Sequence, residues 1–394
     1  MKNFFRQLVN RREFIGGAAV LTSATALGLA AQTKGSSPTT DMTAMKMSGT
    51  TKPEMDMTAM DHGNNITVDF VNPKNNGFDP LEILTDFDKG KVSKLPNGQT
   101  LREFKIVGID KEIEIAPGVK FSAWTFNGRV PGPTLRVTEG DRIRVVFYNE
   151  GSHPHTMHFH GVHPANMDGT PLNQNVVKPG EKFTYEFDAE PFGLMLYHCH
   201  AMPLKRHLHK GMYGAFIIDP KEGRPPAREF VMVMNGFDTN FDSQNDLYAI
   251  NTVAFEYARR AIPIKQNELI RIYLVNVLEF DFINGFHLHA NMFNYYDTGT
   301  TLTPTLKTVD TISQVQGQRG IIEFKYKHLG MYMFHPHISE FTELGWMGHF
   351  NVVRPEDFSA AVQKVGLKPS WEHAGMNGST VPYSHTPSKG GETQ

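Results

Sequence analysis

The feature that most restricts the fold of this chain is an internal repeat. Residues 139–149 (EGDRIRVVFYN) resemble residues 266–276 (QNELIRIYLVN), and a pattern of paired histidines follows each segment. Four His-x-His pairs stand in the same order in both halves: His158/His160 and His198/His200 in the first, His287/His289 and His335/His337 in the second. The spacing between matching features drifts from 127 to 137 residues, as loop insertions would cause. We therefore predict two copies of one domain.

Each copy is built from short runs in which apolar and polar residues alternate. Examples are residues 135–138, 143–147 and 183–187, each bounded by Gly, Pro or Asn nearby. Alternation with a period of two indicates half-buried strands, and many short strands at this spacing are typical of a sandwich. We predict an all-β chain with two Greek-key β-sandwich domains, over residues 67–222 and 223–356.

The N-terminus has the pattern of an export signal. Arg11 and Arg12 form a twin-arginine pair, and a small-residue-rich apolar stretch from residue 16 to 31 follows it. This stretch has the length of a signal peptide and is short for a membrane span. We expect residues 1–31 to be a twin-arginine signal peptide that sends the chain to the periplasm, with no stable membrane insertion after cleavage. An uncleaved anchor helix is the alternative.

Two further segments carry little large apolar content. Residues 32–66 are rich in Thr, Ser, Gly and Met, and the sequence DMTAM occurs at both 41–45 and 56–60. Such a segment cannot bury a core, so we predict a flexible linker. Thioether ligands select Cu(I), which makes the linker a candidate copper arm, although incidental methionines explain it equally well. Residues 357–394 are assigned to a C-terminal tail.

The composition excludes some classes of partner. The formal net charge is −2 and the sequence holds no basic stripe, which argues against a nucleic-acid partner. The chain has a single cysteine, so an intrachain disulfide cannot form.

That cysteine, Cys199, stands between His198 and His200 and is followed by His207 and Met212. Two His, one Cys and a weak axial Met form the ligand set of a mononuclear copper electron-transfer site. Side chains alternate along a strand, so the thiolate would bind one copper while its two histidine neighbours face other metal ions. The second copy has Pro336 in place of the cysteine, so only the first copy holds a thiolate site. A buried, unreactive cysteine is the alternative.

Residues 155–161 (HTMHFHG), together with the His198–Cys199–His200 run, resemble the multicopper oxidase family. Residues 128–136 (GRVPGPTLR) look like that family's strand before its first copper motif, and the resemblance covers residues 105–353. The arrangement, with two domains and the thiolate site only in the first, resembles that of the two-domain laccases related to copper nitrite reductases. The resemblance implies cupredoxin-like domains and four coppers per chain: one type 1, one type 2 and two type 3.

The resemblance also implies a role for each ligand. The type 1 ligands are His155, Cys199, His207 and Met212. The type 2 ligands are His158 and His287. The type 3 ligands are His160, His198, His200, His289, His335 and His337. In three-domain laccases the second type 1 histidine comes five residues after the cysteine, where this chain has Leu204. His207 and His209 are both candidates, and the spacing to Met212 favours His207.

The implied activity is one-electron oxidation of a small reducing substrate, such as a phenol, an amine or Cu(I), coupled to reduction of dioxygen to water. Asp168 resembles the family's acid near the type 2 copper, although a turn aspartate before Gly169 explains it equally well. The two-domain relatives further imply a homotrimer, with each cluster shared between neighbouring chains.

The sequence leaves two other functions open. A copper nitrite reductase would have an aspartate at the position of His158 and commonly an alanine at that of His200, so the sequence disfavours it. A copper-binding or tolerance protein without turnover would leave the eight paired histidines without a role.

Overall fold

The structure is a computed structural model that describes residues 70–173 and 175–372. The predicted signal peptide, the Met-rich linker and the end of the predicted tail lie outside the described residues. No helix in this described part is long and apolar enough to cross a membrane.

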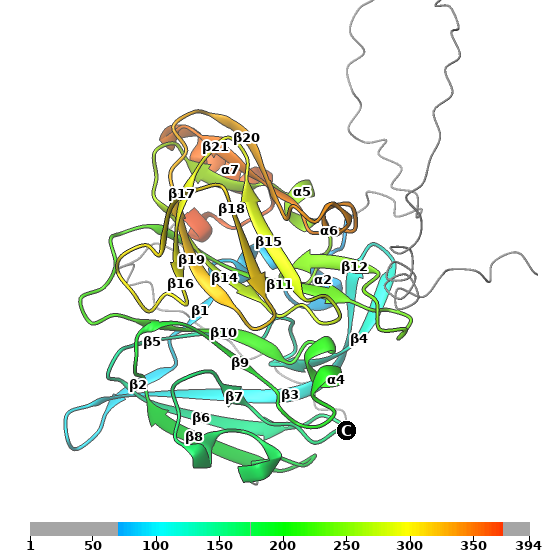
Figure 1. Cartoon of the computed structure of the whole chain (residues 1–394), viewed down its shortest axis with the longest axis vertical. Coiled ribbons are helices and arrows are strands. Elements are labelled where there is room, and N and C mark those ends of the chain that lie inside the picture. The colour runs from blue at the N-terminus through cyan, green and yellow to red at the C-terminus, as the bar shows by residue number, and fades with distance from the viewer. Residues whose placement is uncertain (1–69, 174, 373–394) are drawn as a thin grey trace, which may run out of the picture. The chain divides into compact units, whose positions relative to one another are not determined.

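Two β-sandwiches follow one another along the chain (Figure 1). The first contains β1 (Phe87–Asp88), β2 (Lys91–Lys94), β3 (Thr100–Ala116), β4 (Val119–Phe126), β5 (Thr134–Thr138), β6 (Arg142–Asn149), β7 (His158–Phe159), η1 (Ala165–Met167), η2 (Pro171–Asn173), β8 (Lys182–Asp188), β9 (Gly193–His198), α4 (Leu204–His209) and β10 (Tyr213–Asp219). The helices α2 (Pro73–Asn76) and α3 (Pro80–Ile83) precede it.

The second sandwich is formed from β11 (Arg228–Phe237), β12 (Leu247–Ile250), α5 (Glu256–Arg259), β13 (Ile262–Lys265), β14 (Ile270–Asn276), β15 (Ile283–Leu288), β16 (Phe293–Asp297), β17 (Leu306–Val309), β18 (Thr311–Val315), β19 (Arg319–Phe324), β20 (Gly330–His335), α6 (Ser339–Glu343) and β21 (Gly348–Val353). The segments η3 (Pro355–Asp357), α7 (Phe358–Lys364) and η4 (Pro369–Glu372) complete it.

The first sandwich consists of two sheets around one core. One sheet has the order β2-β3-β6-β8, with β4 paired to β3, and the other has the order β1-β5-β10-β9-β7. The alternation predicted for β6 is present: Ile143, Val145 and Phe147 are buried, while the residues between them are partly exposed. Burial of one face of each sheet supplies the apolar area that stabilises the sandwich.

The second sandwich repeats this plan. The parallel pair β3/β6 with antiparallel β8 corresponds to β11/β14 with β19, and β5/β10 with β9 corresponds to β13/β21 with β20. Even one turn contact is repeated, because the amides of Gly180 and Gly317 donate over 2.8 Å to the carbonyls of Asn149 and Asn276. The predicted all-β class with two related sandwiches is confirmed.

One cluster of buried apolar side chains contains residues of both sandwiches, and a buried ion-pair network crosses the same boundary. The cluster includes Leu194 of the first sandwich and Val231 of the second. The Arg136 guanidinium of the first sandwich lies 2.6 Å from the Glu229 carboxylate of the second, which also accepts from Arg271 over 2.8 Å. Removing one partner of such a network would leave a buried charge unpaired, which is strongly destabilising.

The boundaries of the second sandwich are wider than the sequence indicated. Leu81 of α3 and Phe358 of α7 both lie in its core, as does Trp371, whose indole N–H donates to the Leu81 carbonyl over 3.3 Å. The predicted boundaries assign residue 81 to the first domain and residues 358 and 371 to the tail. Helices of four and seven residues are too short for a recognisable apolar period, which explains the difference.

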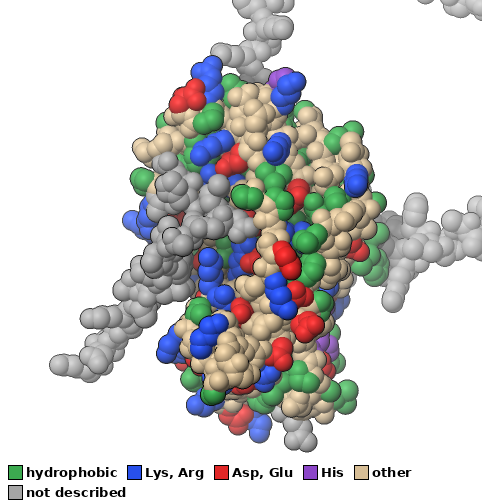
Figure 2. Space-filling model, turned by 90° about the vertical axis from the view of Figure 1, so that its left-hand side faces the viewer, with side chains coloured by type: hydrophobic (Ala, Val, Ile, Leu, Met, Phe, Trp, Pro, Cys, Tyr) green, Lys and Arg blue, Asp and Glu red, His purple; other side chains and the backbone are tan. Residues whose placement is uncertain are grey.

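On the face drawn in Figure 2, cationic and anionic side chains are interspersed among apolar ones. This mixture agrees with the small net charge of the sequence.

Candidate metal centres

Two neighbouring strands and the helix between them position the thiol. Cys199 follows the last residue of β9, and its amide donates over 3.0 Å to the carbonyl of Met212, just before β10. The helix α4 spans the connection and carries His207. His155 reaches the same point from the loop before β7, where it forms an isolated bridge with Val177. Residues far apart in sequence are thus held by backbone hydrogen bonds.

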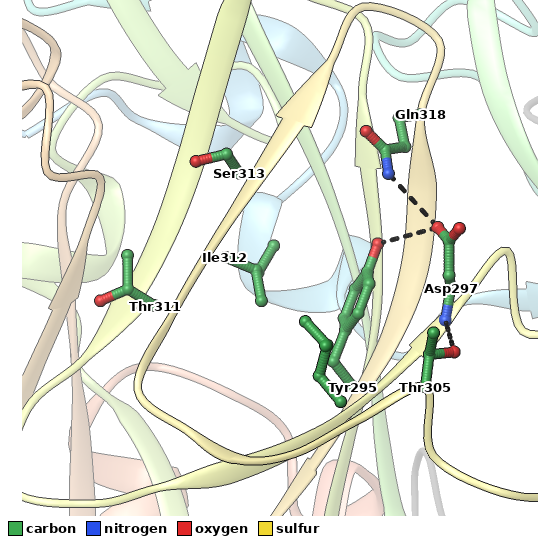
Figure 3. A pocket seen from close by; sticks show the side chains of 8 residues that line it. Tyr295, Asp297, Thr305, Thr311, Ile312, Ser313 and Gln318 are labelled. Carbon is green, nitrogen blue, oxygen red and sulfur yellow. Dashed lines mark hydrogen bonds between the residues drawn. The ribbon is translucent and has the colours of Figure 1, made fainter.

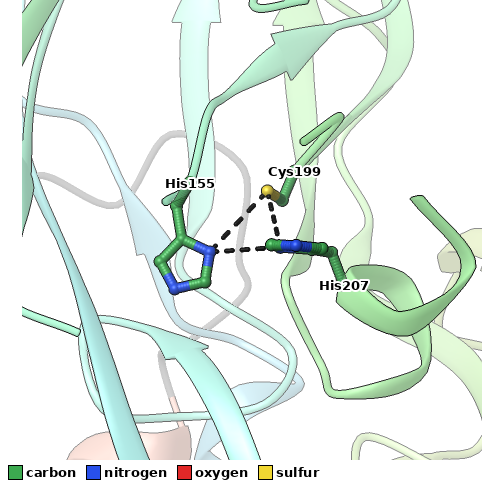
Figure 4. Close-up of side chains that lie close together, drawn as sticks. All are labelled: His155, Cys199 and His207. Atoms are coloured by element: carbon green, nitrogen blue, oxygen red, sulfur yellow. Dashed lines mark hydrogen bonds between the residues drawn. The ribbon is translucent and has the colours of Figure 1, made fainter. Parts of the chain in front are cut away.

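The thiol and two imidazoles converge there (Figure 4). Cys199 Sγ lies 3.2 Å from His207 Nδ1 and 3.9 Å from His155 Nδ1, and the two nitrogens are 3.1 Å apart. All three side chains are buried, and Met212 lies in the same apolar core as Cys199. Three donor atoms in a small triangle fit a single copper ion, because metal–nitrogen and metal–sulfur bonds are about 2.0–2.3 Å long.

Burial controls the protonation of this set. Desolvation raises the pKa of Cys199 to about 11, against the hydrogen bond from the Thr156 amide, which lies 3.3 Å from Sγ. Burial also lowers the pKa of His155 to about 3 and that of His207 to about 4. Both imidazoles are therefore neutral near pH 7 and keep a lone pair for a metal, while a binding metal must displace the thiol proton.

His209, the other candidate for this site, lies in a different environment. Its Nε2 accepts from the amide of Asp238 over 3.1 Å, and its ring packs against Phe121 and Phe280 at 5.3 and 5.1 Å between centroids. Since α4 turns by about 100° per residue, two positions two residues apart face different sides of the helix. The structure brings His207 to the thiol and turns His209 toward the second sandwich.

A second group of imidazoles forms around β7 and β9. The ligand nitrogens of His158, His160 and His198 lie within 4.8 Å of one another, and the Nε2 atoms of His160 and His198 are 3.0 Å apart. His200 is adjacent, with its ring 5.3 Å from that of His158. The register places His158 directly opposite His198 on the neighbouring strand. We call His158, His160, His198 and His200 the first imidazole set.

A third group repeats this arrangement in the second sandwich. The ligand nitrogens of His287, His289 and His335 lie within 4.8 Å of one another, with the Nε2 atoms of His289 and His335 2.9 Å apart. His337 has its ring 4.5 Å from that of His287, and His287 pairs with His335 across β15 and β20. These four histidines form the second imidazole set.

Backbone carbonyls fix the tautomers of two histidines in each set. The Nδ1 atoms of His158 and His198 donate to the carbonyls of Asp168 and Cys199 over 2.8 and 2.9 Å. In the second set, Nδ1 of His287 donates to the Asp310 carbonyl over 3.0 Å, and Nδ1 of His335 to the Pro336 carbonyl over 2.6 Å. A carbonyl only accepts, so Nδ1 carries the proton and Nε2 keeps its lone pair. This is the usual arrangement of metal-binding histidines, and both sets fit metal ions.

Within one chain the two sets stay apart. No hydrogen bond or ring contact between described residues joins an imidazole of the first set to one of the second. Gly317 of the second sandwich, rather than a histidine, lies beside His160: a Cβ built on that glycine would be 3.9 Å from the imidazole. Each set is also partly open to solvent, and His337 is exposed.

Asp168 lies at the edge of the first set. Its carboxylate is 3.2 Å from Nδ1 of His158 and 3.6 Å from Nε2 of His163, and it accepts from the hydroxyl of Thr170 over 3.0 Å.

Two residues near these sites are not marked by the sequence patterns. His163 falls in the same histidine-rich stretch, three residues after His160. Its position could have been noticed from that density alone. Trp124, whose ring contacts both His155 and His207, carried no sequence signal.

The chain also has a 340 Å³ pocket beside the strands β16 to β18, but its lining is of another kind (Figure 3). Asp297 is its single carboxylate, held by Gln318 and Tyr295 over 3.3 and 3.4 Å, and no imidazole lines it. The candidate metal chemistry of the described residues therefore lies outside this pocket.

Comparison with known proteins agrees with the donor sets. Models of the multicopper oxidase family match residues 110–223 and 224–356. A copper-containing nitrite reductase of Neisseria meningitidis serogroup A is 30% identical over 284 residues, which cover 66% of this chain and 72% of that protein. Laccase 1 of Metarhizium acridum is 43% identical over 102 residues, 25% of this chain and 16% of that protein.

Among solved structures, one described as a multicopper oxidase is 56% identical, with a TM-score of 0.71, and covers 72% of this chain and 100% of its own. The family models together match more than half of this chain, and the buried thiol with its imidazoles supplies the donors that copper requires. The chain belongs to the multicopper oxidase family and is a copper-dependent oxidoreductase.

Proposed function

We propose that this protein is a laccase-like oxidase that takes single electrons from a reducing substrate and reduces dioxygen to water. The observation that carries this proposal is the placement of the run from His198 to His200. Cys199 lies in the buried core with His155 and His207, while His198 and His200 belong to the first imidazole set. One short peptide thus connects a thiolate site to a multi-imidazole site.

In this proposal His155, Cys199, His207 and Met212 hold the type 1 copper. His158 and His287 hold the type 2 copper, and the other six paired histidines hold the type 3 pair. Bound copper ions would supply single-electron storage and dioxygen reduction. Burial lowers the pKa of His160 to about 3 and that of His198 to about 4, which keeps both imidazoles neutral near pH 7. A hydrogen bond from Nδ1 of His198 to the Cys199 carbonyl leaves the Nε2 lone pair of that ring for a metal. The peptide between His198 and Cys199 provides a covalent connection between the sites.

The complete oxygen site requires a second copy of the chain. The first and second imidazole sets do not meet within one chain, and exposed apolar side chains lie on η2 of the first sandwich and on β20, the strand that carries His335. Leu172 is 93% exposed, and the next residue, Asn173, donates a hydrogen bond to Asp168. Met331 on β20 is 56% exposed. Cyclic association of identical chains would cover such surfaces and bring the first set of one chain to the second set of the next. We propose a homotrimer on this basis.

Asp168 is proposed to orient His158 and to hold a proton for the reduction of dioxygen. Its carboxylate faces His158 and His163, and the hydroxyl of Thr170 restrains it. The reducing substrate is proposed to be a phenol, an amine or Cu(I), and the twin-arginine leader is proposed to direct export to the periplasm.

Copper nitrite reductase is the second candidate, because a protein of that name covers most of the chain at 30% identity. A nitrite reductase needs two coppers per chain, whereas the oxidase proposed here needs four. Each imidazole set contains four histidines. The first set includes His158 and His200, at the positions where a nitrite reductase has an aspartate and commonly an alanine, and this favours the larger cluster.

Copper counting with visible spectroscopy and gas measurements separates the two candidates. We expect four coppers per chain, an intense thiolate-to-copper absorption band and oxygen uptake with hydroquinone. The variant Cys199→Ser should lose the band. Two coppers per chain, with nitrite turnover and no oxygen uptake, would replace the oxidase by the reductase.

A further inference from the structure

Trp124 on β4 is packed against the imidazoles of the thiolate site. Its ring centroid lies 4.8 Å from that of His207 and 5.4 Å from that of His155. The side chain is 5% exposed and belongs to the same core as Cys199 and Met212. The backbone fixes its place, because the Trp124 amide donates over 2.9 Å to the carbonyl of Lys210, directly after α4.

The other side of this indole reaches the protein surface through two exposed residues. The ring of His153 lies 4.4 Å from the Trp124 ring, and the guanidinium carbon of Arg206 lies 5.4 Å from it. Both residues are exposed. The Ser152 hydroxyl, 2.7 Å from Nδ1 of His153, restrains that imidazole. Trp124 is therefore in contact with the surface on one side and with the buried imidazoles on the other.

The internal repeat provides a comparison within the same chain. Between β3 and β4, Trp124 pairs with Asp110, two residues from the Gly108–Phe126 pair. Between β11 and β12, at the matching place in the second sandwich, Tyr248 pairs with Gly236. Tyr248 stacks on Phe341 at 3.9 Å, and its hydroxyl donates to Asp281 over 2.8 Å. An aromatic ring at this position is thus a shared packing feature, but only the first copy packs it on imidazoles beside a thiol.

We propose that electrons reach the thiolate site through Trp124, from a one-electron donor that touches His153 or Arg206. We call Trp124, His153 and Arg206 the electron port. In each transfer the donor would lose one electron and a copper ion held by Cys199 would accept it, passing from Cu(II) to Cu(I), while the indole would be neither oxidised nor reduced. The indole acts as a packed bridge that couples the donor to His155 and His207. This inference rests on the proposed type 1 site.

The test is anaerobic stopped-flow reduction of the copper-loaded full-length protein by hydroquinone, followed through the thiolate-to-copper band. Trp124→Leu keeps an apolar side chain but removes the ring, and we expect the bimolecular reduction rate to fall roughly 10–100-fold, the range typical for a residue that contacts metal ligands. Trp124→Phe should retain most of the rate. Tyr248→Leu is the matched control and should leave the rate unchanged.

A merely structural role would change the site itself. We therefore expect the absorption band and the reduction potential of Trp124→Leu to match those of the unmodified protein. An unchanged reduction rate in this variant would overturn the proposal. So would a slower rate accompanied by a shifted band or potential, because the ring would then act by shaping the copper site.

A second measurement does not depend on copper turnover or on the leucine variant. The chain has three tryptophans, and Trp346 and Trp371 lie in the core of the second sandwich. Co(II) titration of the copper-free protein should quench the part of the indole emission that Trp124→Phe removes. Unquenched Trp124 emission with Co(II) bound at Cys199 would contradict the contact. A wild-type protein that lacks the blue band would instead count against the proposed function.

Discussion

The Nε–H of Arg319, on the second sandwich, donates over 2.8 Å to the carbonyl oxygen of Leu194, on the first. Leu194 lies on β9, four residues before His198, and its own amide donates over 2.8 Å to the carbonyl of Thr298. Hydrogen bonds from the second sandwich thus fix the start of β9, the strand that Cys199 directly follows. Although this sandwich has no cysteine, it helps to position the one in its neighbour.

Arg319→Leu removes this hydrogen bond and leaves the Leu194 carbonyl without its partner. We expect the free energy of unfolding to fall by about 1–3 kcal/mol, the cost of an unsatisfied buried acceptor. Urea unfolding of the copper-free protein measures it. Arg354→Leu, at a position whose side chain is 61% exposed, is the control and should stay within about 0.5 kcal/mol of the unmodified protein. Equal stability of the two variants would show that the contact contributes nothing.

His207→Ala and His209→Ala distinguish the two candidate ligands. Because His207 Nδ1 lies 3.2 Å from the thiol while His209 accepts from the Asp238 amide, only the first substitution should abolish the thiolate-to-copper band. Visible absorption after copper loading checks this. A band that survives in His207→Ala and vanishes in His209→Ala would reverse the assignment.

His335→Ala separates the two proposed copper sites. His335 belongs to the second imidazole set, far in sequence from the thiol, so the variant should keep the blue colour and lose oxygen uptake. An oxygen electrode and a visible spectrum on the same sample give both readings. His328→Ala, at an exposed position, is the control that should keep both. Undiminished oxygen uptake in His335→Ala would exclude the second sandwich from the site.

Asp168→Asn keeps the shape of the side chain and removes its charge. We expect oxygen reduction to slow roughly 10–100-fold with the blue band intact, because the carboxylate faces His158 and His163. Steady-state oxygen uptake checks this against Asp357→Asn, a change at a side chain that is 58% exposed. If both variants reduce oxygen at the same rate, Asp168 is a turn residue only.

The copper-free protein should lose stability as the pH falls below about 6.5. Burial lowers the pKa of His155 to about 3 and of His207 to about 4, so the unfolded chain binds protons more readily than the folded one in this window. The two neutral imidazoles make their full contribution to the free energy of unfolding above their pKa in the unfolded chain. As the pH falls below that pKa, each contribution declines by about 1.4 kcal/mol per pH unit, because protons bind the unfolded state. Urea midpoints measured from pH 7.5 to 4.5 test this.

His207→Gln should make that pH dependence shallower, because one of the titrating groups is removed. Equal slopes in the variant and the unmodified protein would mean that burial of His207 has no part in acid sensitivity.

Much of the fold and of the candidate sites could be predicted because the relevant signals are local. The alternation in β6 and the repeated His-x-His pairs specify strands and ligand types without knowledge of the rest of the chain. The positions of Trp124 and Arg319 could not be predicted in this way. Each depends on a contact between segments that lie about 80 or more residues apart, and neither residue type has a spacing that marks it. Trp371 lies in η4, a segment of four residues that is too short to show an apolar period.

The structure also has a consequence for quality control of the protein. Cys199 is the only sulfhydryl in the chain and is fully buried when the first sandwich is intact. In an oxidising medium, disulfide-linked dimers can therefore arise only from molecules whose first sandwich has opened. A disulfide-linked dimer band on a non-reducing gel of an aged sample thus detects molecules whose first sandwich has opened, with no label or added probe.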